Sequence, residues 1–178
     1  MRWVVFLRGV NVGKANRCQP AVIASQLSRL GVINIGAVGT FVVREDVSES
    51  ALHAAIAKQL SFKCEIMIFP ARDIIRLAAK DPFTGQPSGE KITRFVSVLA
   101  KPPPLPLPLP LNLPHYLPSP DDWLLKIIAI QDRFVFGVYR REMKAIGYLG
   151  KIEKLLGVSA TTRNWNTIAK IAKTLSED

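Results

Sequence analysis

A proline-rich run at residues 101–120 constrains this chain more than any other segment. It reads KPPPLPLPLPLNLPHYLPSP and holds nine of the thirteen prolines. Proline has no backbone N–H to donate and its ring fixes φ, so the run is excluded from helix interiors and central strands. We expect an extended segment with polyproline II geometry. Its leucines favour a stiff strap over the apolar surface of its own domain; docking in an aromatic groove of a partner protein is the alternative.

Hydrophobic periodicity predicts helices and strands on both sides of this run. In the first half we expect strands at residues 3–8, 33–38, 41–44 and 65–69, with helices at residues 19–30, 48–60 and 71–79. The first strand is apolar on both faces, so we expect it to be covered on both sides. In the second half we expect strands at residues 93–100, 123–130 and 133–139, with helices at residues 151–156 and 162–175. The order β-α-β-β-α-β in the first half is typical of the ferredoxin-like split arrangement.

The mixed pattern predicts an α+β fold of two tandem ferredoxin-like subdomains. Residues 1–85 form the first, and residues 86–178 form the second, in which the strap at residues 101–120 takes the place of one helix. A chain of 178 residues has the length of one ordinary domain or of two small ones. Because 48% of the residues are hydrophobic, the chain can build a core without disulfides or metals.

The sequence favours a cytoplasmic protein that neither spans a membrane nor carries a metal or other cofactor. The first apolar run ends at Arg8, too early for a signal-peptide core, and no long uncharged apolar stretch is free of proline. Cys18 and Cys64 have no CxxC or metal-ligand spacing, and we expect them to be buried as small apolar side chains. No HExxH, GxSxG or paired-carboxylate pattern points to catalysis, so enzymatic activity stays undecided.

The net charge of +10 comes from 24 lysines and arginines against 14 acidic residues. The excess concentrates between Arg140 and Lys173, where eight basic residues face only Glu142 and Glu153. Such a field attracts anions and speeds association with polyanions, and it also keeps a protein soluble. The charge therefore favours an anionic small molecule or a nucleic acid as the partner.

A glycine-rich segment, GVNVGK at residues 9–14, directly follows the first predicted strand. It is not a Walker loop, because the glycines are one residue too close and Ala15 replaces the hydroxyl residue. The segment could still form an anion nest, in which Asn11 and the glycines, Gly13 among them, contribute polar groups and Arg8, Lys14 and Arg17 add positive charge. The alternative is a tight loop whose backbone is tied down by the Asn11 side chain.

The segment TTRNWNT at residues 161–167 is predicted to open the last helix. Threonines can cap a helix N-terminus, and Trp165 would anchor this helix to the sheet. Arg163 and Asn164 beside a helix N-terminus are candidate anion ligands. If this segment and the loop at residues 9–17 lie together, they line one basic cleft.

Three stretches, LRGVNVG at 7–13, DPF at 81–83 and TTRNWNT at 161–167, together resemble a bacterial family known as domain of unknown function 1697. The resemblance implies two ferredoxin-like halves and no particular activity. The chain departs from the family pattern where Val38-Gly39-Thr40 replaces Ser-Gly-Asn. It departs again where the Leu-Pro run replaces a helix, and at residues 141–147, where a Gly-rich turn with Ser-Lys is missing.

Three functions stay open at this point. The first is binding of a phosphate-bearing or otherwise anionic ligand, a nucleic acid or a nucleotide, in a basic cleft. The second is a small enzyme that acts on an anionic metabolite, and the third is a structural or assembly module. Each predicts a different partner: a polyanion or nucleotide, a metabolite, or another protein chain.

Overall fold

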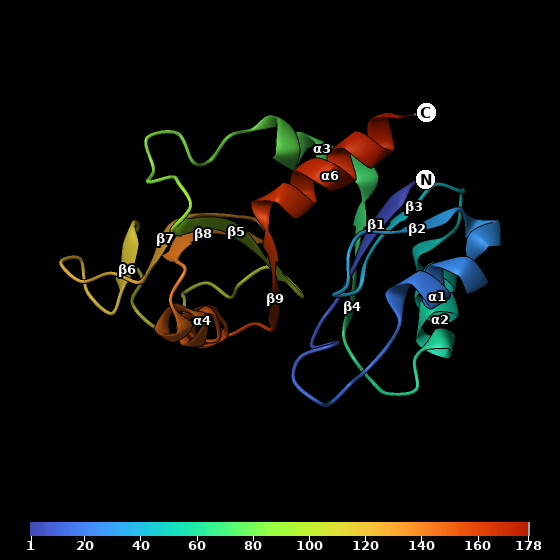
Figure 1. Cartoon of the computed structure of the whole chain (residues 1–178), viewed down its shortest axis with the longest axis horizontal. Helices are drawn as coiled ribbons and strands as arrows, with labels where there is room; N and C mark the ends of the chain where they lie inside the picture. The colour runs from blue at the N-terminus through green and yellow to red at the C-terminus, as the bar shows by residue number, and fades with distance from the viewer. Residues whose placement is uncertain (178) are drawn as a thin grey trace. The chain divides into compact units, whose positions relative to one another are not determined.

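The computed structural model describes residues 1–177 and shows an α+β protein with two antiparallel sheets (Figure 1). The chain divides into two compact units. The first unit holds residues 1–80 and the chain from Asn166 onward, and the second holds residues 81–165. The predicted division after residue 85 assigns the last helix to the second half, whereas the compact units group this helix, from Asn166, with the first.

The first unit contains a four-stranded sheet in the order β2-β3-β1-β4. Its strands are β1 (Trp3–Leu7), β2 (Val32–Asn34), β3 (Thr40–Val43) and β4 (Ile66–Pro70). Its helices are α1 (Pro20–Gln26), the 3-10 helix η1 (Ser28–Leu30), α2 (Glu49–Gln59) and α3 (Ala71–Ala79), followed at the end of the chain by α6 (Trp165–Ser176). All five residues of β1 are buried, which confirms the prediction of a strand covered on both faces.

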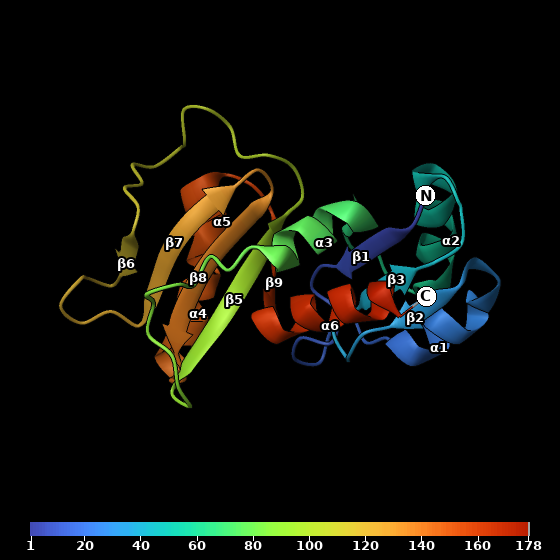
Figure 2. The ribbon, with the colours of Figure 1, turned by 90° about the horizontal axis from the view of Figure 1, so that it is seen from above.

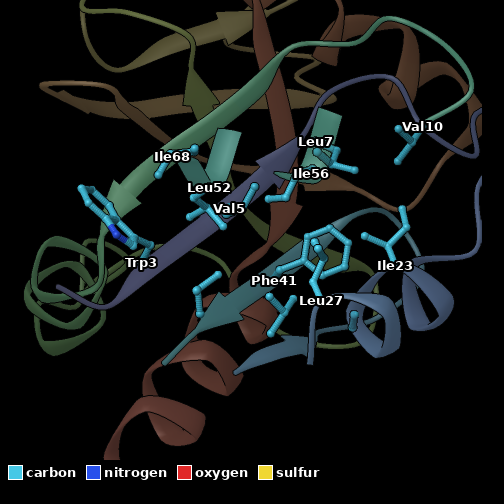
Figure 3. Close-up of a cluster of buried hydrophobic side chains, with 13 residues drawn as sticks. Trp3, Val5, Leu7, Val10, Ile23, Leu27, Phe41, Leu52, Ile56 and Ile68 are labelled. Atoms are coloured by element: carbon cyan, nitrogen blue, oxygen red, sulfur yellow. The ribbon is translucent and has the colours of Figure 1, made fainter. Parts of the chain in front are cut away.

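Helices α1 and α2 pack on one face of this sheet, as Figure 3 shows for the side chains in between. Val5 and Leu7 of β1 point to that face and meet Phe41 of β3 and Ile56 of α2. The helix ends follow the local chemistry of the sequence. Ser48 Oγ accepts the backbone N–H of Ala51 at the start of α2 (3.3 Å), as cap residues do.

The second unit contains a five-stranded sheet in the order β6-β7-β8-β5-β9. Its strands are β5 (Ile92–Leu99), β6 (His115–Leu117), β7 (Leu125–Gln131), β8 (Phe134–Arg140) and β9 (Ala160–Asn164). Helices α4 (Met143–Leu149) and α5 (Lys151–Leu156) lie on one face of this sheet (Figure 2). Ile152 and Leu156 of α5 pack there against Phe95 and Ile127 in the core of the unit.

The proline-rich run packs on the second unit as a strap, through every second leucine of its central part. Leu107 and Leu111 lie against the core of the unit, whereas Leu105 is 90% exposed and Leu109 is also exposed. The run also forms the edge strand β6 between Pro114 and Pro118, which the sequence patterns did not predict. An edge strand accommodates such neighbours because one of its sides needs no hydrogen-bond donors.

The prediction that a helix starts at residue 162 is wrong. Residues 160–164 form β9, which pairs antiparallel with β5, and α6 begins at Trp165. The two threonines, predicted as caps, instead lie in the strand, where Thr162 Oγ1 is 2.6 Å from Ser97 Oγ of β5. β-Branched residues suit both roles, and only the free edge of β5 selects the strand.

Candidate functional site

The side chain of Asn11 is used to hold the loop at residues 9–18 together. Its Nδ2 donates to the Ala37 carbonyl (2.8 Å), and its Oδ1 accepts the backbone N–H of Cys18 (3.0 Å). Asn11 adopts a left-handed backbone (φ 55°), and its own N–H donates to the Asn16 carbonyl (3.0 Å). The Asn11 side chain thus fastens the backbone of this loop.

The cations of this loop differ in their surroundings. The Nε of Arg8 lies 3.6 Å from Glu65 Oε2, and the Arg8 backbone N–H donates to the Glu65 carbonyl (3.0 Å). Lys14 and Arg17 are exposed and form no ion pair or hydrogen bond within residues 1–177. Gly13 lies in the exposed part of the loop with φ 62°. A shallow groove of about 560 Å³ runs beside the loop, lined by Asn11, Arg17, Cys18, Gln19, Ala37 and Val38.

Arg163, the candidate ligand on β9, is 5% exposed. Its Nη1 donates to Thr161 Oγ1 (2.7 Å) and to the Thr162 carbonyl (3.1 Å). Burial lowers the pKa of the Arg163 guanidinium to about 10, so it remains a cation at neutral pH. Asn164 is exposed at the end of β9. Both residues belong to the second unit, whereas Arg8, Asn11, Gly13 and Lys14 belong to the first.

A pocket of about 720 Å³ lies in the second unit, where β5 begins and β8 ends. It is lined by Pro87, Lys91, Ile92, Trp123, Arg140, Arg141 and Glu142, and we call it the Arg140 pocket. Sheet pairing builds it from three distant segments. Ile92 pairs with Arg140 between β5 and β8, the Arg141 N–H donates to the Lys91 carbonyl (2.9 Å), and the Arg140 N–H donates to the Leu124 carbonyl (2.8 Å).

Three cations of this pocket have no acidic partner among residues 1–177. The Arg140 guanidinium lies over the ring of Trp123, with 4.6 Å between its Cζ and the ring centroid. Its Nε is buried and makes no hydrogen bond with any described residue. Arg141 Nε donates to Thr93 Oγ1 (3.1 Å), and Lys91 is exposed at the rim. Within residues 1–177 none of the three forms an ion pair, although the carboxylate of Glu142 also lines the pocket.

Such a pocket attracts an anion and offers an apolar wall beside it. Three positive charges against one acid create a positive potential, and Pro87, Ile92 and Trp123 supply low-polarity surface. Its volume lies in the range of small-molecule sites. No three His, Cys, Asp or Glu side chains of the described chain lie together in a way that could hold a metal ion.

The sequence patterns did not single out these residues. The charge excess after Arg140 pointed to the region, but Lys91 and Trp123 lie far from it along the chain. They join Arg140 only because β5 and the start of β7 flank β8. The one local signal is Trp123 at the start of the strand predicted at residues 123–130, and a tryptophan there is equally consistent with core packing.

Both cysteines are free thiols in the first unit. We expected them to be buried, but they are only half-buried against the core of the unit. Burial raises the pKa of each thiol, and negative charge on Cys18 and Glu65 raises that of Cys64 further. The helices of the described chain all fall short of the length and apolar character that a membrane span requires.

Comparison with known proteins confirms the resemblance seen in the motifs. The model of the family described as "Protein of unknown function (DUF1697)" matches residues 1–109. No curated protein matches the chain. Among solved structures, the conserved bacterial protein SP0830 from Streptococcus pneumoniae is similar, with a TM-score of 0.59 and 16% identity over 98% of each chain. At this identity the likeness concerns the fold alone.

Proposed function

We propose that this chain, which belongs to the DUF1697 family, binds a phosphate-bearing or otherwise anionic ligand in the Arg140 pocket. The observation that carries the proposal is the absence of acidic partners, among the described residues, for Lys91, Arg140 and Arg141. Charged groups gathered in one place without counter-charges repel each other. A bound anion relieves this repulsion by placing negative charge beside the three cations.

The sequence-predicted residues offer a second position for the same function. In the loop at residues 9–18, Lys14 and Arg17 are available to an anion, and Arg17 lines the adjacent groove. Asn11 and Arg8 are engaged in contacts of the loop itself. We favour the Arg140 pocket because it gathers three cations around one cavity, whereas the groove has a single lining cation.

Calorimetric titration of the full chain with pyrophosphate tests the proposal and separates the two positions. We expect binding at low salt that weakens as the salt concentration rises, since the attraction is between charges. The double variant Lys91→Ala/Arg141→Ala should bind about 10- to 100-fold more weakly, the usual effect of losing charge-assisted hydrogen bonds.

The double variant Lys14→Ala/Arg17→Ala is the matched control, because it also removes two exposed cations. It should bind pyrophosphate as the natural chain does. Loss of binding in this variant alone would assign the site to the loop. If the natural chain shows no heat of binding at low salt, the proposed function is wrong.

We also infer that each unit is a variant of the ferredoxin-like arrangement. The strand order β2-β3-β1-β4 of the first sheet recurs in the second as β7-β8-β5-β9, with β6 added at its edge. In both sheets all the paired strands run antiparallel. This strand order supports the inference, and an experimental structure with another order in either sheet would contradict it.

A further inference from the structure

We infer that the anion in the Arg140 pocket is the phosphate of a nucleotide whose base stacks on the aromatic side chains of the same sheet face. The inference rests on the proposed function and names its ligand class. A free nucleotide and a single-stranded nucleic acid share this chemistry. Contacts that extend beyond the pocket favour single-stranded nucleic acid over a free nucleotide as the ligand.

Two aromatic side chains near the pocket each have a cation over the ring. Besides Arg140 and Trp123, Lys126 Nζ lies 5.2 Å from the ring centroid of Tyr116. Both rings are half-buried, so part of each remains accessible to a ligand. A base can stack on such a ring while the neighbouring cation contacts its phosphate.

The two pairs lie on one face of the sheet. Tyr116 of β6 is paired with Lys126 of β7, which is paired with Val138 of β8. Side chains at directly paired positions point to the same face, and residues two apart along a strand do so too. Arg140 therefore shares the face of Val138, Lys126 and Tyr116.

Short contacts connect the second pair to the pocket. Lys126 Nζ donates to Gln86 Oε1 (2.7 Å), and the next residue, Pro87, lines the pocket wall. Helices α4 and α5 cover the opposite face, where Phe95, Leu125 and Ile127 form the core of the unit (Figure 2). Rings and cations thus gather on the face opposite these two helices, at the margin of its buried part around Phe83, Phe136 and Val138.

This combination suits single-stranded nucleic acid. Aromatic residues on a sheet face stack bases without regard to sequence, and cations between them follow the phosphates. Lys91 and Arg141, exposed at the rim, are placed to contact a phosphate while the base lies against Trp123. Two stacking positions predict that an oligonucleotide binds more tightly than a mononucleotide.

Fluorescence anisotropy with a labelled eight-residue oligothymidylate, together with calorimetry of thymidine monophosphate and pyrophosphate, tests this inference on the full chain. We expect the oligonucleotide to bind more tightly than the monophosphate. Trp123→Leu should weaken oligonucleotide binding about 5- to 100-fold, the usual effect of losing one stacked base, while Trp123→Phe retains most of it. Pyrophosphate binding should fall less than oligonucleotide binding in Trp123→Leu, because Lys91, Arg140 and Arg141 all remain.

The matched control is Tyr148→Leu. Tyr148 also carries a cation over its ring, Lys151 at 4.5 Å, but it packs on the helix-covered face. Oligonucleotide binding that survives Trp123→Leu, or that falls equally in Trp123→Phe or Tyr148→Leu, overturns the inference and leaves the proposed function standing if pyrophosphate still binds. Tighter binding of the monophosphate than of the oligonucleotide assigns the site to free nucleotides. Absence of binding to all three ligands overturns both proposals.

Discussion

The ring of Phe83 packs edge-on against the indole of Trp165, with 5.2 Å between the centroids and 67° between the planes. Phe136 of β8 meets both rings, at 6.5 and 6.0 Å. The Asp81 carboxylate accepts the backbone N–H of Phe83 (2.9 Å) and so fixes the turn that presents this ring. Two of the segments that carry the family resemblance, DPF and TTRNWNT, thus form one packing cluster.

The first prediction concerns this cluster. Phe83→Ala should lower the free energy of unfolding by about 3–5 kcal/mol, because Phe83 is fully buried and its removal leaves a cavity between two rings. Urea denaturation followed by circular dichroism measures the loss. Met143→Ala, at a side chain that is 88% exposed, should stay within about 0.5 kcal/mol of the natural chain. A loss below about 1 kcal/mol for Phe83→Ala would show that the cluster is not a support of the fold.

A second prediction uses two glycines of one turn. Gly39 (φ 74°) lies so close to Leu7 that an added Cβ would be 2.7 Å from the Leu7 Cβ, whereas Gly36 (φ 85°) has open space around it. Gly36→Ala should cost only the backbone strain, about 1–2 kcal/mol. Gly39→Ala adds a clash in the core and should cost about 1–3 kcal/mol more. Equal midpoints for the two variants in a thermal melt would contradict this account.

The third prediction separates the two sides of the proline-rich strap. Leu107→Ser should lower the free energy of unfolding by about 1–2 kcal/mol, because this side chain lies against the core of the second unit. Leu105→Ser makes the same chemical change at a 90% exposed position and should have little effect. Guanidinium denaturation of both variants measures the difference. A strap that contributes no burial would give two indistinguishable curves.

The fourth prediction concerns the thiols of the first unit. Burial, then negative charge on Cys18 and Glu65, raises the pKa of Cys64. Alkylation of Cys64 by iodoacetamide should therefore reach half its maximal rate at a higher pH than for a thiol in a short peptide. Cys18→Ser removes one of the raising charges and should move this midpoint to lower pH. Mass spectrometry of the Cys64 peptide follows the reaction, and an unchanged midpoint would place the two thiols too far apart to interact.

The same shift has a consequence for stability. In the unfolded chain Cys64 ionises at its ordinary pKa, while the folded chain still holds the proton. Over that interval the unfolded state binds fewer protons, so the free energy of unfolding falls as the pH rises. The fall should begin above about pH 8.5. It should be smaller in Cys64→Ser, and equal slopes in both proteins would contradict the assigned cause.

Local patterns predicted those elements whose physics is local. Five consecutive apolar residues indicated β1 as a doubly covered strand, and helix α5 ends at Gly157, which adopts the left-handed backbone that closes a helix (φ 66°). Strand β9 and helix α4 escaped prediction. Strand β9 was missed because Thr161 and Thr162 suit a helix cap and a strand equally well. Helix α4 was missed because residues 141–147 contain no capping residue and no periodic apolar stripe that would predict a helix.

The sequence by itself determined the α+β class, the family, the order of most elements and the location of the excess positive charge. Each of these depends on composition or on residues within a few turns of each other. Only the tertiary structure decided that the Asn11 amide is used within its loop, that Arg163 is buried, and that Lys91, Trp123 and Arg140 line one pocket. The physical reason is that pairing of β5, β7 and β8 brings together residues that are distant in the sequence. The burial of the side chains at the ends of these strands, and the charges around them, depend on neighbours in other strands, which no local sequence pattern specifies.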